Sequence, residues 1–141
     1  MKVMVFSDFH NRYELLPILE KKAKIADVIV CAGDPTVFER DLQHVLAALD
    51  SWGKPVLIFH GNHEDEETLK EACKPFKHLD FFHGQERIIR GVRFLGWGGG
   101  GFSTTDYELE SKIKEWKKDD ERPTILVTHA PPHGTLLDDI G

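Results

Sequence analysis

The sequence predicts a single α/β domain built on a parallel sheet, and two features of the chain carry this prediction. Short apolar runs at Lys2 to Phe6, Val28 to Ala32 and Pro55 to Phe59 alternate with stretches of helical spacing. This order is typical of right-handed crossovers between parallel strands. The runs are apolar throughout rather than alternating, which favours strands covered on both faces. The length of 141 residues fits one domain spanning 1–141, and we see no internal repeat or linker.

Three helices are expected around these runs. Asn11 to Ile25 places its leucines along one helical face and has Pro17 in the first turn, where the missing N–H costs little. Thr36 to Leu49 repeats apolar residues at i, i+3, i+4 and i+7. Glu64 to Cys73 begins with an acidic run, which the helix dipole stabilises. Helices of this kind would cover the faces of the sheet.

The second half of the chain has shorter runs and more turn residues. Strands are expected at residues 80–82, 85–89, 92–95 and 124–128, and a helix at 106–118. The step Arg90-Gly91 predicts a tight hairpin turn between two of these strands. The second half therefore differs from the parallel pattern of the first.

Composition excludes several classes of protein. Hydrophobic residues make up 40% and charged residues 30%, which is not the composition of a disordered or fibrous chain. The 18 Lys and Arg residues are spread along a chain of net charge −6, so there is no basic footprint for nucleic acid. No apolar run reaches the roughly 20 residues that span a membrane. Asp8 interrupts the first run too early for a signal peptide, so we expect a cytoplasmic location.

Polar side chains with acid–base or metal-binding chemistry follow four of the apolar runs. Asp8 and His10 follow the first run, Asp34 the second, His60 to Glu64 the third, and His129 the run at 124–128. Ligands of open α/β sheets bind outside the carboxyl ends of the strands, so these groups can converge. Asp8 and His10 are two residues apart and point to the same side of an extended segment. The glycines before Asp34 and Asn62 permit close approach of the backbone.

The donor set indicates a metal site. Imidazole, carboxylate and amide oxygen together suit Mn, Fe, Zn or Ni better than Ca. Asp34 is placed between the other groups, where one carboxylate can bridge two cations. Each residue alone has a simpler interpretation: Asp8 with His10 as a salt bridge or turn cap, and Asp34 as the N-cap of a helix near Thr36. The order and spacing of all the groups favour the metal site.

These residues resemble a known family, the calcineurin-like metallophosphoesterases. The resemblance rests on four blocks in order: Asp8-Phe9-His10, Gly33-Asp34, Gly61-Asn62-His63-Glu64 and Thr128-His129-Ala130-Pro131-Pro132. They match the D-x-H, G-D, G-N-H-[DE] and H-x-P-P patterns and span residues 8 to 132. Each block follows an expected strand, and the combination is far more specific than any one block.

The resemblance implies a fold, a site and an activity. The fold would be an α/β/β/α sandwich of two mixed sheets. Asp8 and His10 would bind a first divalent ion, Asp34 would bridge, and Asn62 and His129 would bind a second. His63 would be catalytic rather than a ligand, beside the phosphate, and would protonate or stabilise the leaving oxygen. A metal-bridging hydroxide would hydrolyse a phosphodiester or small phosphomonoester, with Mn favoured over Ni, Fe or Zn.

One block of the family pattern, G-H-x-H, is absent from these 141 residues. We therefore expect a C-terminally incomplete sandwich in which each ion lacks one nitrogen ligand. The exposed sheet edge would invite association of copies into a homo-oligomer. The absence also keeps open an alternative function, a non-catalytic binding or assembly subunit that retains the fold. A small phosphate ester is the expected partner of the enzyme, with no nucleic acid and no membrane.

A second motif competes with this interpretation. Gly96 to Gly101 formally contains G-x-G-x-x-G, the outline of a dinucleotide site. Consecutive glycines match this pattern easily by chance, and no strand ending in an acidic residue follows at the required distance. We therefore interpret the segment as a loop near the substrate entrance and keep dinucleotide binding as a minor alternative.

Overall fold

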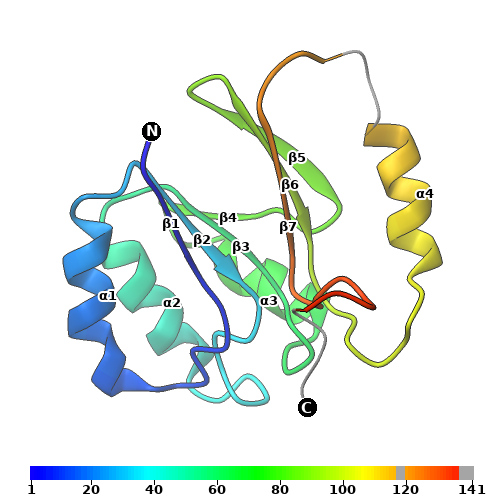
Figure 1. Ribbon diagram of the computed structural model, residues 1–141. Coiled ribbons are helices and arrows are strands. Elements are labelled where there is room, and N and C mark those ends of the chain that lie inside the picture. Colours follow the sequence, from blue (N-terminus) through cyan, green and yellow to red (C-terminus); the bar gives the residue numbers. More distant parts are fainter. Residues whose placement is uncertain (117–119, 137–141) are drawn as a thin grey trace.

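Two β-sheets pack face to face in the computed structural model, which describes residues 1–116 and 120–136 (Figure 1). The first sheet contains β1 (Val3–Phe6), β2 (Val28–Ala32), β3 (Val56–Phe59) and β4 (Leu79–Phe81), in that order. All three neighbouring pairs of strands are parallel. The parallel sheet predicted from the apolar runs is therefore confirmed, and β4 joins it as a fourth strand.

The second sheet is mixed and contains β5 (Gln85–Ile89), β6 (Val92–Trp97) and β7 (Thr124–Thr128). β5 and β6 are antiparallel, whereas β7 runs parallel to β6. The hairpin between β5 and β6 turns at Arg90 and Gly91, whose φ angles are 49° and 78°. Two successive positive φ angles are the geometry of a tight hairpin turn, so the predicted turn is confirmed.

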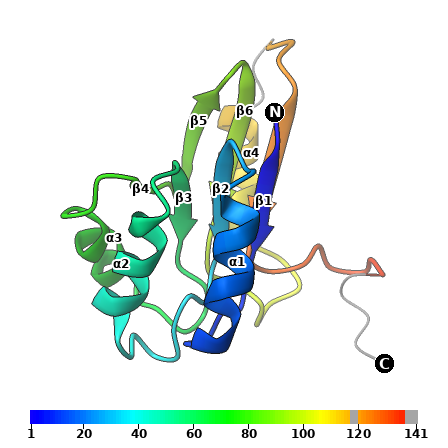
Figure 2. The ribbon, with the colours of Figure 1, turned by 90° about the vertical axis from the view of Figure 1, so that its left-hand side faces the viewer.

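Helices cover the outer faces of both sheets (Figures 1 and 2). The short helix η1 (Tyr13–Leu15), α1 (Leu16–Ala23), α2 (Leu42–Ser51) and α3 (Glu66–Cys73) lie on the side of the first sheet. α4 (Tyr107–Trp116) lies beside the second sheet, where the Trp116 ring meets Trp97 at 6.4 Å between centroids. The expected α/β/β/α order of layers is confirmed. No helix in the described part of the chain is long and apolar enough to cross a membrane.

Strand β2 shows why its sequence is apolar on both faces. Its side chains alternate between two hydrophobic clusters, since Ile29 and Cys31 pack with the helices while Val28, Val30 and Ala32 pack against the second sheet. All five residues are buried. A strand in the middle of two layers has no solvent face, which produces a continuous apolar run instead of an alternating one.

The prediction of a helix over Thr36 to Leu49 was wrong in its first part. α2 begins only at Leu42, and residues 36–41 form an irregular loop. The Thr36 N–H and hydroxyl both donate to the Glu64 carboxylate, at 3.0 and 2.7 Å, which holds the segment away from helical geometry. Asp34 therefore does not cap a helix. The predicted helix end at 117–118 and the tail at 137–141 lie outside the described residues.

Candidate metal centre

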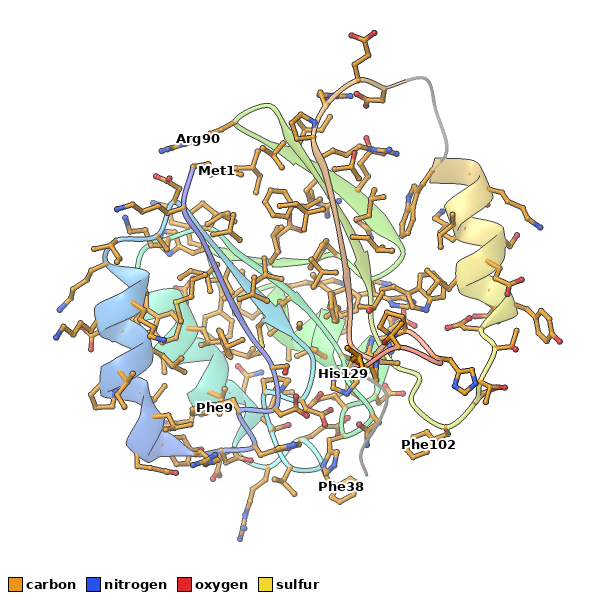
Figure 3. All side chains as sticks on the ribbon, in the orientation of Figure 1. Met1, Phe9, Phe38, Arg90, Phe102 and His129 are labelled. Atoms are coloured by element: carbon orange, nitrogen blue, oxygen red, sulfur yellow. The ribbon has the colours of Figure 1, made fainter. Side chains whose placement is uncertain are left out.

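The loops after β1, β2, β3 and β7 bring the six predicted site residues together at one end of the molecule. Asp8 and His10 follow β1, Asp34 follows β2, Asn62 and His63 follow β3, and His129 follows β7. Because β7 belongs to the second sheet, the site spans both sheets. Figure 3 labels His129 at the end of β7, beside the loops of the first sheet.

Asp34 lies at the centre of this group and is 2% exposed. Its Oδ2 atom is 3.6 Å from His10 Nε2, and its Oδ1 atom is 3.7 Å from His129 Nε2. Potential ligand atoms of His10, Asp34 and His63 lie within 4.8 Å of one another, and so do those of Asp8, Asp34 and His129. The Asp34 carboxylate thus belongs to both groups and presents one oxygen to each.

The backbone that carries these groups is in an unusual conformation. Asp8, His10 and Asp34 have φ angles of 53°, 47° and 53°. The left-handed region is uncommon for residues other than glycine, although Asp, Asn and His adopt it several-fold more often than most. Here the loops after β1 and β2 hold each other, because Asp8 N–H donates to Gly33 O at 3.2 Å and His10 N–H to Asp34 O at 3.1 Å.

Two glycines allow the loops to approach one another. A Cβ atom on Gly61 would lie 1.9 Å from Asp34 Oδ1, and one on Gly33 would lie 2.4 Å from His129 Nδ1. Gly33 also has a φ of 91°, which residues with a side chain rarely adopt. The close backbone approach predicted at these glycines is confirmed.

The tautomers of two histidines follow from their backbone partners. His10 Nδ1 lies 3.1 Å from Thr36 O, and His129 Nδ1 lies 2.9 Å from Ala32 O. A carbonyl oxygen only accepts, so each Nδ1 carries the hydrogen and donates it. In the neutral ring, each Nε2 then has a lone pair directed at the carboxylate cluster. This arrangement, with one ring nitrogen donating to a carbonyl, is typical of histidines that bind metals through the other nitrogen.

Asn62 and His63 follow β3 and have different surroundings. Asn62 Oδ1 lies 3.1 Å from His129 Nε2. His63 donates its backbone N–H to Asp34 Oδ1 at 3.0 Å, and its Nε2 lies 3.9 Å from Asp34 Oδ2. His63 Nδ1 is buried and has no hydrogen-bond partner among the described residues. The His63 ring instead contacts His10, with centroids 4.7 Å apart, and Phe38, at 4.5 Å.

Glu64 connects the loop after β3 to the loop after β2. Its side chain is buried and accepts hydrogen bonds from the N–H and hydroxyl of Thr36 and from Gly61 N–H. Burial raises the pKa of Glu64, while these hydrogen bonds act in the opposite direction. Glu64 thus ties the loop after β3 to Thr36 in the loop after β2.

Sequence reasoning missed Thr36 and Phe38. Thr36 is fully buried beside the cluster, whereas Phe38 is 74% exposed at its edge. Both residues lie in the segment that was predicted as a helix. Phe38 fits the apolar periodicity of that helix, so the pattern gave no reason to assign it another role. The neighbouring proline, Pro35, gave no warning, because it restricts only Asp34, the residue before it, and the predicted helix began at Thr36.

A second pair of histidines lies next to the glycine-rich loop. Gly98 N–H donates to His83 Nδ1 at 2.8 Å, and the His60 and His83 rings are 4.7 Å apart. Burial lowers the pKa of His60 to about 4 and also lowers that of His83. A Cβ on Gly98 would lie 2.3 Å from His60 O, so the loop packs tightly on this strand end. These contacts give both histidines packing roles beside the glycine-rich loop.

The dinucleotide alternative does not fit this geometry. Gly96 is a strand residue paired with Val127 of β7, and a Cβ there would lie 2.5 Å from the Phe82 ring. The first helix after the glycines begins at Tyr107, so no helix N-terminus opens directly from the motif.

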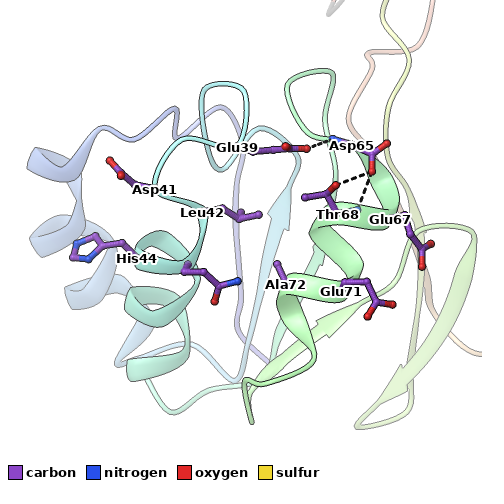
Figure 4. Close-up of a pocket in the computed structure, with 10 residues that line it drawn as sticks. Glu39, Asp41, Leu42, His44, Asp65, Glu67, Thr68, Glu71 and Ala72 are labelled. Carbon is purple, nitrogen blue, oxygen red and sulfur yellow. Dashed lines mark hydrogen bonds between the residues drawn. The ribbon is translucent and has the colours of Figure 1, made fainter.

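A hollow of about 1080 Å³ lies between α2 and α3, away from the predicted site residues (Figure 4). Its charged lining is acidic and consists of Glu39, Asp41, Asp65, Glu67 and Glu71. Asp65 N–H donates to Glu39 at its upper rim, at 2.8 Å. None of the six residues of the cluster lines this hollow. The site predicted from the motifs therefore lies at the strand ends and not in this hollow.

The chain resembles one curated protein in sequence and two solved structures in fold. The chain is 29% identical over 147 residues to uncharacterized protein MJ1162 of Methanocaldococcus jannaschii, which covers 98% of this chain and 64% of that protein. One solved crystal structure superposes with a TM-score of 0.77 at 16% identity, over 94% of this chain and 70% of the other. The crystal structure of TT1561 of Thermus thermophilus gives a TM-score of 0.73 at 16% identity, over 88% of this chain and 65% of the other.

The chain thus spans 64% of the length of its curated relative. A family model described as calcineurin-like phosphoesterase matches residues 1–140, which include all four sequence blocks. With that match over nearly its whole length and the expected two-sheet fold, the chain belongs to the calcineurin-like phosphoesterase family.

Proposed function

We propose that the chain hydrolyses a phosphodiester or a small phosphomonoester with two divalent cations. Asp8, His10 and Asp34 would hold one cation, and Asp34, Asn62 and His129 the other. The observation that supports this proposal best is the position of Asp34, whose two oxygens face different imidazoles at 3.6 and 3.7 Å. Family membership supports metal-dependent phosphoesterase chemistry in general.

The chemistry of the donor set fits cations. His10 and His129 donate their Nδ1 hydrogens to backbone carbonyls, so each Nε2 presents a lone pair to a carboxylate oxygen. Asn62 Oδ1, also an acceptor, lies 3.1 Å from His129 Nε2. Acceptors that face one another repel unless a positive charge lies between them. A divalent cation at each position would remove this repulsion and use every lone pair.

The protein groups have separate tasks in this proposal. Asp8 and Asp34 supply the negative charge that holds the cations beside an anionic phosphate. Bound divalent cations supply Lewis-acid stabilisation of the phosphate and activation of water at neutral pH. His63 Nε2 points toward the cluster, 3.9 Å from Asp34 Oδ2, where it could transfer a proton to the leaving oxygen. We keep His63 as the proton donor, although its nitrogen is also close enough to act as a ligand.

The test compares metal-dependent hydrolysis by the chain and two variants. Purified protein is freed of metal, supplied with Mn, Ni, Fe or Zn, and assayed on bis-p-nitrophenyl phosphate and p-nitrophenyl phosphate. We expect hydrolysis only with metal, with Mn most effective. Asp34→Asn should lose at least about 100-fold in activity, because it removes a ligand shared by both ions.

Asp41→Asn is a matched control, because Asp41 also has a left-handed φ, of 50°, but lies outside the cluster. It should keep the wild-type rate. A rate that chelators leave unchanged would contradict the proposal. Metal binding by titration without any hydrolysis would support the alternative, a non-catalytic binding or assembly subunit. The expected cytoplasmic location and the homo-oligomer formed through a sheet edge stay predictions.

A further inference from the structure

Phe38 is an exposed aromatic residue held beside the cluster in an unfavourable conformation. Its side chain is 74% exposed, and its φ angle is 48°. An aromatic side chain in the left-handed region is uncommon, and exposing its ring to water brings no compensating burial. Stability of the chain alone therefore gives no reason for this residue to be here.

The loop that carries Phe38 is fixed by hydrogen bonds on both sides of it. Val37 N–H donates to Asn11 Oδ1 at 2.8 Å, and Asn11 Nδ2 donates to Arg40 O at 2.8 Å. Glu39 N–H donates to the Thr36 hydroxyl at 3.1 Å. The positive φ of Phe38 is thus imposed by its neighbours, and the position of its ring is determined rather than arbitrary.

The Phe38 ring stacks on His63, with centroids 4.5 Å apart and an interplanar angle of 26°. His63 Nδ1 has no hydrogen-bond partner among the described residues, so ring contacts orient this imidazole where a hydrogen bond usually would. Figure 3 labels Phe38 and His129 at the same end of the molecule. Phe38 and His63 together form a stacked pair of rings, named here the aromatic wall, next to the candidate metal centre.

We propose that the aromatic wall binds the leaving group of the ester and selects alcohols that carry a flat aromatic ring. Phe38 is the specificity-determining residue, and it also positions His63. The inference rests on the proposed function, because it takes the phosphate to lie over the cluster. A ring attached near the leaving oxygen would then extend from His63 along Phe38, where stacking of aromatic faces stabilises the complex.

The test uses three phosphate esters of primary alcohols: benzyl, cyclohexylmethyl and ethyl. Benzyl and cyclohexylmethyl groups have similar size but differ in flatness and aromaticity, and ethyl has no ring. The wild-type chain should have a higher kcat/KM for the benzyl ester than for the cyclohexylmethyl ester. Phe38→Leu should lower that ratio roughly five- to tenfold, because leucine keeps the apolar contact but not the stacking. Phe38→Tyr should restore the ratio.

Tyr107→Leu is the matched control, since Tyr107 on α4 is also exposed, at 78%, and stacks on no ring in the described part of the chain. Its benzyl-to-cyclohexylmethyl ratio should equal that of the wild type. An unchanged ratio in Phe38→Leu, or an equal loss in Tyr107→Leu, would overturn the inference.

Two further measurements separate this inference from the proposed function. The zinc-loaded chain should bind benzylphosphonate more tightly than cyclohexylmethylphosphonate, which requires no hydrolysis. In the metal-free chain, the ring-proton resonances of His63 should shift in Phe38→Leu, because the ring current of Phe38 is lost. Selective binding of benzylphosphonate without hydrolysis of any ester would contradict the proposed function but support the inferred role of the aromatic wall. Hydrolysis without any preference for the benzyl group would support the proposed function but contradict the role of the aromatic wall.

Discussion

The two ends of the parallel sheet differ in how their backbone is held. In the part of the chain that the structure describes, seven of the eight non-glycine residues with positive φ follow β1 or β2 at the carboxyl end: Asp8, His10, Asn11, Asp34, Phe38, Glu39 and Asp41. At the amino end, residues 24–27, 52–55 and 74–78 lead into the strands, and only Gly53 among them has a positive φ. Both ends belong to the same sheet and share the same buried strands.

The left-handed residues thus gather beside the candidate site rather than at both ends of the sheet. The amino end reverses the chain with ordinary turns and local hydrogen bonds, such as Gly53 N–H to Asp50 O at 3.1 Å. The carboxyl end must bring charged and aromatic groups from separate loops to one place, and it adopts unfavourable φ angles to do so. The buried strands between the ends supply the stability that tolerates this cost.

The comparison predicts that a glycine-to-alanine substitution lowers stability more at the carboxyl end than at the amino end. The substitution at the carboxyl end, Gly33→Ala, should have the largest effect. Gly33→Ala would place a Cβ 2.4 Å from His129 Nδ1 at a φ of 91°. We expect the free energy of unfolding to fall by about 3 kcal/mol, from overpacking and left-handed strain together. Metal binding should be lost, because His129 must move. Urea denaturation and metal titration measure the two effects.

Gly53→Ala is the counterpart at the amino end, where φ is 65° but nothing lies within 4 Å of the added Cβ. It should lower the free energy of unfolding by only about 1 kcal/mol, because backbone strain is then the sole cost. Metal binding should be unchanged. Equal losses at both glycines would mean that the crowding at the carboxyl end carries no additional cost.

An effect that depends on pH is expected from His60, which lies at the same crowded end. Burial lowers its pKa from 6.5 to about 4, so the folded chain keeps His60 neutral where the unfolded chain protonates it. The unfolded state then binds more protons between these values, and the stability that neutral His60 contributes is present above pH 6.5 and lost as the pH falls toward 4. The free energy of unfolding should decrease over this window.

His60→Phe tests the assignment, since phenylalanine fills the site without titrating. Any constant packing penalty cancels when each protein is compared with itself at two pH values. The variant should lose less stability than the wild type between pH 6.5 and 4. Identical pH profiles would show that other groups account for the whole decrease.

Convergence of the site residues could be predicted from the sequence because it follows from topology. Once β1, β2 and β3 are parallel neighbours, Asp8, Asp34 and Asn62 must emerge at one edge. His129 also follows an apolar run, but it comes from the other sheet, so the parallel order of β1, β2 and β3 does not by itself place it beside the rest. The parallel sheet was also predictable, because continuous apolar runs indicate strands that are buried on both faces.

The loop at residues 36–41 could not be predicted from local pattern. Val37 and Phe38 suit the apolar face of a helix, and the periodicity continues smoothly into α2. The deciding interaction is the bond from Thr36 to Glu64, whose partners are 28 residues apart in the sequence. Contacts of this range depend on the packed fold, so periodicity alone does not reveal them. β4 is a similar case, because pairing with β3 rather than composition decides its sheet.

The smallest predicted effect concerns Asn11, which holds the strained loop from outside the cluster. Asn11→Gly removes the bonds to Val37 N–H and Arg40 O but relieves a φ of 57°. The two contributions oppose each other, so the free energy of unfolding should fall by only about 1 kcal/mol. The preference for benzyl over cyclohexylmethyl esters should fall as well, because Phe38 would no longer be held against His63.

Asn11→Asp, which keeps the acceptor and tolerates the left-handed region, should retain most of that preference. An Asn11→Gly protein that is more stable than the wild type and keeps the whole preference for benzyl esters would contradict this prediction. It would mean that contacts other than those of Asn11 hold the loop at residues 36–41.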